Sequence, residues 1–221
     1  IDLKLRYMFA NNSMKQPSLF FAGLGFYYLL THEKAKPPAS PVKYMFPHNF
    51  IQLNYFNRDI LDADASKYFS PPYLPIFFRG AINVKDALLL MYQRNFFHTQ
   101  KNFSLEWGVS GGRFSSRELK QKFYTVSIFP ELKIWMVRCP RFDLYFTYSL
   151  AGPTYISRHI IDGIDSGGNF TFQDFLGLGA LVGCSKHVSV SLKIVHYSSG
   201  NLYSHNPGVK IPVMFALTYA W

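Results

Sequence analysis

His196 and Ser198 are the two residues whose types and spacing most directly suggest catalysis. They lie two positions apart near the end of an alternating segment, so both side chains project from one face of the predicted strand. Residues at this spacing lie about 6–7 Å apart at Cα, close enough for a histidine–serine hydrogen bond. A histidine that accepts the proton of a serine hydroxyl makes that serine a nucleophile. Alternatively, if the strand crosses a membrane, these two residues lie at the level of the polar lipid headgroups, where polar side chains are common and neither residue has to be catalytic.

Asp174 is the carboxylate that the predicted strand pairing brings to this histidine. With a three-residue turn at 184–186, Val182 pairs with Val188, and Asp174 then falls directly opposite His196. Directly opposed side chains have Cβ atoms about 4.5–5.5 Å apart, within reach of a hydrogen bond. We therefore expect Asp174 to orient His196 and to stabilise its charged form. A structural aspartate at the aqueous rim is the alternative, and a two-residue slip in pairing would separate the two side chains.

Alternation of apolar and polar residues predicts the strands that position these groups. Six clear strands and two weaker ones are expected, at 102–114, 122–137, 141–152, 169–183, 187–198 and 209–221, and at 73–84 and 87–97. The apolar faces run for about ten residues, the length that spans a bilayer at barrel tilt. The opposite faces are small and polar, as a narrow lumen requires. The pattern predicts an all-β protein: an eight-stranded antiparallel transmembrane β-barrel over 73–221 with an N-terminal extension.

The composition excludes several other classes. Aromatic residues make up 18% of the 221 residues and charged residues only 16%, the reverse of a disordered chain. No apolar run reaches the roughly 18 residues that a transmembrane helix needs. The formal net charge of +10 calls for an anionic partner, either nucleic acid or phosphorylated lipid. Because the basic residues are dispersed and form no recognised module, we expect a lipid surface and no nucleic acid.

Loop lengths predict an orientation for this barrel. Cys139-Pro140 and Ser185-Lys186 lie in short turns, whereas 155–168 and 199–208 are longer loops. Outer-membrane barrels have short periplasmic turns and long external loops, so 199–208 should face outside. Cys139 and Cys184 both fall between predicted strands, where a disulfide across one rim is geometrically conceivable.

Residues 1–72 admit two interpretations. A charged start at Met14-Lys15, an apolar run over 19–30 and a Pro-rich stretch over 32–41 resemble a secretory signal occupying about 14–40. Alternatively, this part of the chain supplies further strands or an accessory element, at 1–10, 18–30 and 44–56.

Residues 196–208, His-Tyr-Ser-Ser-Gly-Asn-Leu-Tyr-Ser-His-Asn-Pro-Gly, resemble the PagL-type lipid A 3-O-deacylase family. Phe-x-Phe-Gln-Asp-Phe-Leu-Gly-Leu-Gly at 170–179 is similar to the family's sixth strand. The resemblance is good over 168–221, looser over 73–167 and absent before that. Family members are eight-stranded outer-membrane barrels that hydrolyse an ester-linked acyl chain of lipid A, with no cofactor and no metal. The resemblance implies a lipopolysaccharide substrate in the outer leaflet.

The resemblance also implies roles for residues. Ser198 would be the nucleophile and His196 the base, while Asn206 and backbone N–H groups near Gly200 would stabilise the oxyanion. Ser199 departs from the family, which usually has asparagine there.

The family's acid is missing from its usual place. It lies at the start of the last strand, where this chain has Lys210 between Val209 and Ile211, so no register supplies a carboxylate. Asp174 is therefore the candidate for the third member of the triad.

The remaining polar residues suggest weaker roles. Arg158, His159 and His205 lie in long loops and are candidates for binding lipid phosphate. Glu106, Glu131 and Lys133 have lumen parity, so we expect them to form a buried ion-pair network that fills the narrow barrel.

The first functional hypothesis is thus an outer-membrane serine esterase acting on lipid A. A second is a non-catalytic small barrel that binds lipopolysaccharide or serves as a structural anchor. A third, a soluble lipid-carrier barrel, would be recovered without detergent. The sequence does not fix the oligomeric state.

Overall fold

The computed structural model describes residues 44–61 and 80–221. Its eight long strands are β1 (Asn49–Asn57), β2 (Ile82–His98), β3 (Phe103–Ser116), β4 (Lys122–Arg138), β5 (Phe142–Ile156), β8 (Phe170–Val182), β9 (Val188–Ser198) and β10 (Val209–Ala220). Two short strands, β6 (Ile160–Ile161) and β7 (Ile164–Asp165), form a hairpin between β5 and β8. The described residues include no helix that is long and apolar enough to cross a membrane.

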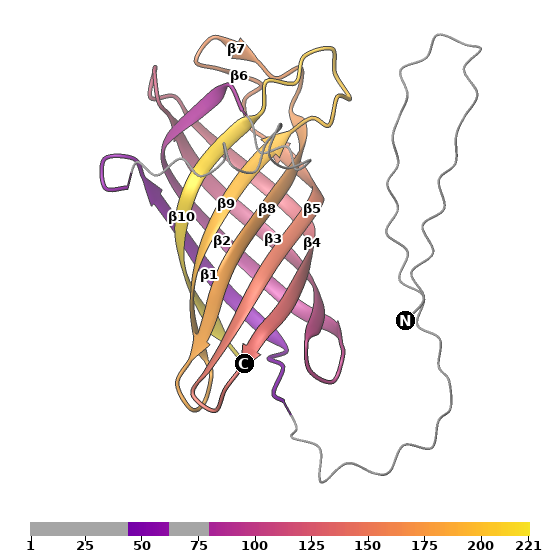
Figure 1. The fold of residues 1–221 in the computed structure, drawn as a ribbon. Helices are drawn as coiled ribbons and strands as arrows, with labels where there is room; N and C mark the ends of the chain where they lie inside the picture. The colour runs from indigo at the N-terminus through magenta and orange to yellow at the C-terminus, as the bar shows by residue number, and fades with distance from the viewer. Residues whose placement is uncertain (1–43, 62–79) are drawn as a thin grey trace, which may run out of the picture. The chain divides into compact units, whose positions relative to one another are not determined.

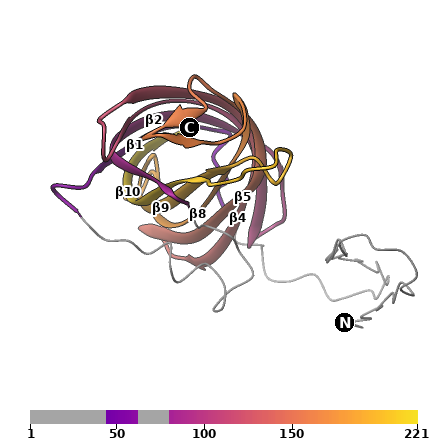
Figure 2. The same ribbon diagram turned by 90° about the horizontal axis from the view of Figure 1, so that it is seen from above.

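The long strands form a closed antiparallel barrel. Each pairs with the next along the chain, and β10 returns to pair with β1 (Figures 1 and 2). β1 is too short to reach the first residues of β10. These residues, Val209 and Lys210, pair instead with Ile82 and Asn83 at the start of β2, in a parallel arrangement. The predicted fold class, an all-β eight-stranded antiparallel barrel, is confirmed.

Two expectations about the strands are wrong. Residues 87–97 do not form a separate strand, because β2 is continuous over Ile82–His98. A bulge between Val84 and Asp86 shifts the phase of alternation by one residue, which made one strand look like two. The expected strand 73–84 contributes only its last residues, and its first part lies outside the described residues.

The eighth strand is β1, within the segment that we expected to be an extension. Its outward side chains Ile51, Leu53 and Tyr55 are exposed, and its inward Gln52 and Asn54 are buried. The barrel therefore starts at Asn49, not at residue 73, and the alternative reading of 44–56 as a strand fits the structure. The signal-like segment 14–40 lies outside the described residues.

The two faces of the barrel wall have opposite character. Exposed apolar side chains cover the outer face, among them Leu53, Leu90, Val126, Ile128, Leu178, Leu192 and Leu217. The lumen holds buried polar residues, in which Glu106 and Glu131 lie 3.5 Å from the ammonium of Lys133. The predicted lumen network is thus present, and Lys193 extends it at 3.5 Å from Glu131.

The two ends of the barrel differ in the length of their connections. The end that carries the C-terminus has short turns, in which Cys139 and Cys184 are free thiols. The opposite end carries loop 199–208 and the β6–β7 hairpin (Figure 1). Asp162 in the hairpin turn accepts hydrogen bonds from the Ser116 hydroxyl and the Leu119 amide, which fasten the hairpin to the β3–β4 loop.

Candidate active site

Asp174 and His196 meet on the outer wall of the barrel, near its long-loop end. Val182 pairs with Val188, and Asp174 lies directly opposite His196 in the β8–β9 ladder. The Asp174 Oδ2 atom lies 3.6 Å from His196 Nδ1. Although the imidazole is on the outward face, it is only 3% exposed. A buried imidazole beside a half-buried carboxylate has its ring orientation restricted by packing and by charge.

A bulge in β5 holds the carboxylate of Asp174 from the other side. The β5–β8 ladder breaks between Ser149 and Gly152, so the two residues between them leave the ladder. Ala151 adopts a φ of 55°, and its backbone N–H donates to Asp174 Oδ1 at 2.6 Å. One carboxylate oxygen is thereby fixed by the backbone, which leaves the other directed at His196.

The opposite flank of His196 is basic. Lys210 of β10 is its register partner, at the position where the sequence resemblance led us to expect an acid. Asn83 of β2 is in turn the register partner of Lys210. Paired residues project from the same face of a sheet, so Asp174, His196, Lys210 and Asn83 form one row across four neighbouring strands. We call these four residues the polar row.

Ser198 is the last residue of β9 and is half-buried. It is two residues after His196, so its side chain is the next one on the same face of the strand. The chain then turns sharply: the Leu202 amide donates to the Ser199 carbonyl at 3.1 Å. Gly200 and Asn201 have φ of 60° and 64°, the left-handed conformation that glycine and asparagine tolerate best. The turn leads the backbone away from the wall directly after the serine.

Asn206 closes this loop against the end of β9. Its Oδ1 accepts a hydrogen bond from the Ser199 amide at 2.9 Å, and its Nδ2 donates to Asn201 at 3.1 Å. A Cβ atom placed on Gly200 would contact the ring of Phe172 at 3.3 Å. Asn206 and Gly200 thus lie in the loop that follows Ser198, where the sequence predicted the oxyanion donors. In this arrangement the side-chain amide of Asn206 makes its hydrogen bonds to other residues of the loop, Ser199 and Asn201.

The loop residues predicted to bind phosphate are less closely tied to the site. Arg158 is exposed, and the carbonyl of His159 accepts hydrogen bonds from Ser166. His205 is exposed, and its Nδ1 lies 3.1 Å from the hydroxyl of Ser204. Their role in binding substrate remains a prediction. Within residues 44–61 and 80–221, no cluster of three or more His, Cys, Asp or Glu side chains is arranged to hold a metal ion.

An apolar row lies next to the polar row, toward the C-terminal end of the barrel. Tyr148, Leu176, Ile194 and Val213 are register partners across β5, β8, β9 and β10. Leu176 and Ile194 are only 6% and 5% exposed, although they face outward. These side chains pack against one another and give the polar row an apolar support.

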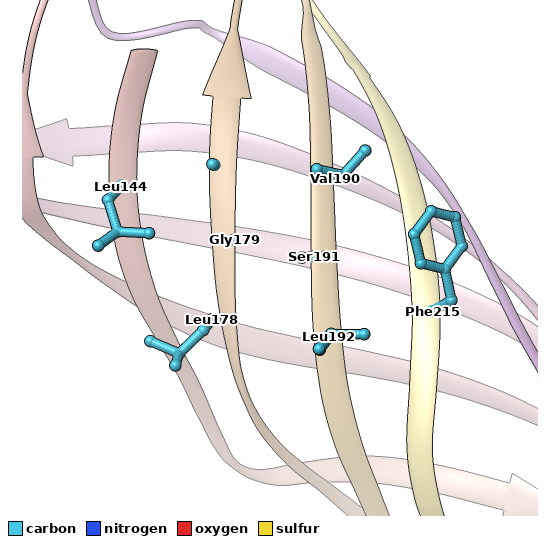
Figure 3. A pocket seen from close by; sticks show the side chains of 8 residues that line it. Leu144, Leu178, Gly179, Val190, Ser191, Leu192 and Phe215 are labelled. Atoms are coloured by element: carbon cyan, nitrogen blue, oxygen red, sulfur yellow. The ribbon is translucent and has the colours of Figure 1, made fainter. Parts of the chain in front are cut away.

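Farther down the same wall is an apolar groove of about 190 Å³ (Figure 3). Leu178, Val190, Leu192 and Phe215 line it. Leu192 is six positions from Ser198 along β9, about 20 Å at strand spacing. The groove is therefore separate from the polar row and holds none of its residues.

Sequence reasoning found the Asp174–His196 pair but missed two of its neighbours. The β5 bulge was not foreseen, although the sequence Ala151-Gly152-Pro153 interrupts the alternation at that point. Asn83 lies next to Lys210 because β1 is short, so that the start of β10 pairs with the start of β2. Nothing in the local sequence of Asn83 signals that pairing.

Comparison with known proteins places this barrel in a family. The family model described as "Lipid A 3-O-deacylase (PagL)" matches residues 86–218, more than half of the chain. The solved structure titled "Crystal structure of the outer membrane enzyme PagL" is similar with a TM-score of 0.51 and 14% identity, over 78% of this chain and 97% of that one. At this identity the likeness establishes the fold.

A second solved structure, the Yersinia pestis outer membrane protein Ail in a phospholipid bilayer nanodisc, matches with a TM-score of 0.40 and 12% identity, over 80% of this chain and 100% of that one. No curated protein matches the chain. The match to the family model runs from within β2 to within β10 and includes Asp174, His196 and Lys210 of the polar row, whereas Asn83 precedes it. The chain belongs to the PagL family of lipid A 3-O-deacylases.

Proposed function

We propose that this protein is an outer-membrane serine esterase that removes the 3-O-linked acyl chain of lipid A. The observation that carries the proposal is the placement of Ser198, His196 and Asp174 on one outward face of β8 and β9. Membership of the lipid A 3-O-deacylase family supplies the reaction class. The outward face supplies access to a substrate embedded in lipid.

The proposed reaction uses Ser198 and His196 in turn. His196 Nε2 takes the hydroxyl proton while Ser198 Oγ attacks the ester carbonyl carbon. The bond between that carbon and the sugar oxygen then breaks, and the imidazolium gives its proton to the departing oxygen, which leaves as the sugar hydroxyl. Water, deprotonated by the same imidazole, hydrolyses the acyl-serine and releases the fatty acid.

Asp174 lies at Nδ1, which directs Nε2 toward the serine. Its negative charge stabilises the imidazolium that forms during attack. At 3.6 Å the carboxylate and Nδ1 are an ion-pair distance apart, so a small adjustment on substrate binding completes the hydrogen bond. Backbone N–H groups of the turn after Ser198 are the candidates for the oxyanion site, with Asn206 if its amide leaves Asn201.

The same proposal places the barrel in the outer membrane of a Gram-negative cell. The exposed apolar side chains of the outer wall suit a hydrocarbon surround, and the long loops suit the external side. Fractionation tests the location: recovery only with detergent, in the outer-membrane fraction, is the expected result. Recovery without detergent would support the soluble carrier barrel instead.

Mass spectrometry of lipid A from cells that express the protein tests the activity. We expect the wild type to remove one hydroxyacyl chain and the Ser198→Ala variant to remove none. Ser185→Ala is the matched control, because Ser185 is an exposed serine in the β8–β9 turn at the opposite end of the barrel. Unchanged lipid A with correctly folded wild-type protein would favour the non-catalytic lipopolysaccharide-binding barrel.

A further inference from the structure

The polar row is asymmetric in charge about His196. Asp174, which carries a carboxylate, is the register partner on the β8 side, and Lys210, which carries an ammonium, is the register partner on the β10 side. Both are register partners of the same histidine, so their Cβ atoms are about 4.5–5.5 Å from its own, on opposite sides. The two register partners of His196 therefore put an anionic side chain on its β8 side and a cationic side chain on its β10 side, next to Ser198 on the same strand.

The basic side of the row continues onto β2. Asn83, the register partner of Lys210, is half-buried; its Nδ2 donates one hydrogen bond to the Ala81 carbonyl at 3.2 Å, and the same NH₂ group carries a second N–H that can donate to a ligand. The backbone N–H of Arg117 donates to the Asn83 carbonyl at 2.9 Å, which places the start of a second basic side chain beside the row.

Two carboxylates accompany these basic groups. Arg117 lies 3.9 Å from Glu118, and Lys85 lies 3.4 Å from Asp59. In both pairs the carboxylate side chain is largely exposed to solvent. Exposed ion pairs are weak, so a phosphate can compete with these carboxylates for the basic side chains. Lys210 is the cation of this flank that lies within the polar row itself.

We propose that Lys210, together with Asn83, binds a phosphomonoester of the substrate headgroup beside the scissile ester. The inference rests on the proposed function and deepens it by naming a group that the enzyme recognises. A phosphate and an acyl ester on one sugar are separated by only a few bonds, which suits neighbouring sites on β9 and β10. A lysine ammonium binds such a phosphate as a point charge, and an asparagine amide adds a directed hydrogen bond.

The position of Lys210 explains the departure from the family at this residue. Because Asp174 can orient His196 from β8, the residue at the start of β10 does not have to be an acid in this chain. A cation at this position also adds to the attraction of the whole protein, with its net charge of +10, for anionic lipid.

Binding to an uncleaved ligand tests the inference separately from turnover. The Ser198→Ala protein in detergent micelles is titrated with a diacylated glucosamine phosphate and with the same lipid after removal of its phosphate. We expect the phosphorylated lipid to bind at least about tenfold more tightly, and the added substitution Lys210→Gln to bring this ratio close to one. Asn83→Ala should lower the ratio by a smaller factor.

Lys122→Gln is the matched control, because Lys122 is an exposed lysine that begins β4 at the same end of the barrel. It should leave the preference for phosphorylated lipid intact. An unchanged ratio in Lys210→Gln, or an equal fall in Lys122→Gln, would overturn the inference. Neither result would affect the esterase proposal, which is tested by whether lipid A from cells that express the wild type, and not from cells that express Ser198→Ala, has lost a hydroxyacyl chain.

A third arm distinguishes the source of the phosphate. Inorganic phosphate alone is titrated into the Ser198→Ala protein, and we expect no saturable binding, because the lipid's acyl chains must hold the phosphate at the row. Tight binding of free phosphate that Lys210→Gln removes would assign the site to a soluble anion and overturn the lipid assignment.

Discussion

At the residue scale, the proposed mechanism needs a carboxylate beside His196, although Lys210 stands at the start of the last strand. A central strand has two neighbours, and a side chain on either neighbour can reach the same histidine, since cross-strand distances are similar on both sides. In this chain β8 supplies the carboxylate and β10 the ammonium. The catalytic requirement is a carboxylate beside Nδ1, and no particular strand has to provide it.

Replacing Asp174 should therefore disable the histidine while leaving the fold intact. We expect Asp174→Asn to lower kcat for acyl release by about 10²–10⁴-fold, because the imidazole loses both its orientation and the charge that stabilises its protonated form. Asp86→Asn is the control, since Asp86 is a half-buried aspartate of β2 outside the polar row. Rates are measured from fatty acid released by purified protein in micelles.

A second substitution tests whether the position of the carboxylate is interchangeable. In the Asp174→Asn background, Lys210→Glu restores a carboxylate next to His196 and should recover part of the lost rate. Lys210→Gln in the same background removes the ammonium without adding an acid, and should recover none. Equal rates for the two double variants would show that no carboxylate at β10 can serve this histidine.

At the element scale, the turn that follows Ser198 sets the position of the nucleophile. Gly200 has a positive φ and lies against Phe172, so Gly200→Ala adds both backbone strain of about 1 kcal/mol and a close contact with the ring. We expect a large loss of acyl release. Gly163→Ala is a matched control, because Gly163 also has a positive φ, of 78°, but an added Cβ would meet nothing within 4 Å. It should lose similar stability and keep its activity; equal activity losses in both variants would count against a positioning role for the turn.

The β6–β7 hairpin is a second element whose position depends on one side chain. Burial alone would raise the pKa of Asp162, but hydrogen bonds from Ser116, Leu119 and Glu118 outweigh it and hold the pKa below its usual value. A lowered pKa in the folded state means that docking is stabilised above the unfolded pKa of about 3.9 and is lost as the pH falls through the folded value. Amide exchange at Ile161 should accelerate in that acidic window, and Asp162→Asn should remove most of this pH dependence. Exchange that depends on pH equally in both proteins, after correction for intrinsic rates, would contradict this role.

At the scale of the whole molecule, the sequence predicts most of the fold because a barrel wall has one strict requirement. Side chains must alternate between lipid and lumen, so the strands from 102 onward and the Asp174–His196 register can be read directly. Alternation is a poor guide where it is interrupted: because of the bulge in β2, one strand was predicted as two, and nine-residue β1 was predicted only in one of the two alternatives for residues 1–72 and was not counted in the barrel. The flank formed by Lys210 and Asn83 arises from barrel closure, a long-range pairing that no local pattern contains.

The buried ion-pair network in the lumen connects side chains from several strands around the barrel. Glu131 of β4 accepts a hydrogen bond from Thr147 of β5 and lies 3.5 Å from both Lys133 and Lys193, the latter on β9. All these charges are buried, and Lys193 also donates to Gln52 of β1 at 2.9 Å. Strands on opposite sides of the barrel are thereby joined through its interior.

Removing one charge from this network should destabilise the entire barrel. Glu131→Gln leaves an excess of buried positive charge and should lower the free energy of unfolding by about 3–5 kcal/mol, measured by urea unfolding in micelles with tryptophan fluorescence. Glu118→Gln is the control: its ion pair with Arg117 is exposed at 3.9 Å, so its loss should cost less than about 1 kcal/mol. Adding Lys193→Met to Glu131→Gln removes the excess charge and should recover part of the loss. If the double variant is less stable than Glu131→Gln, packing of the lysine stem, and not charge balance, is what holds the lumen together.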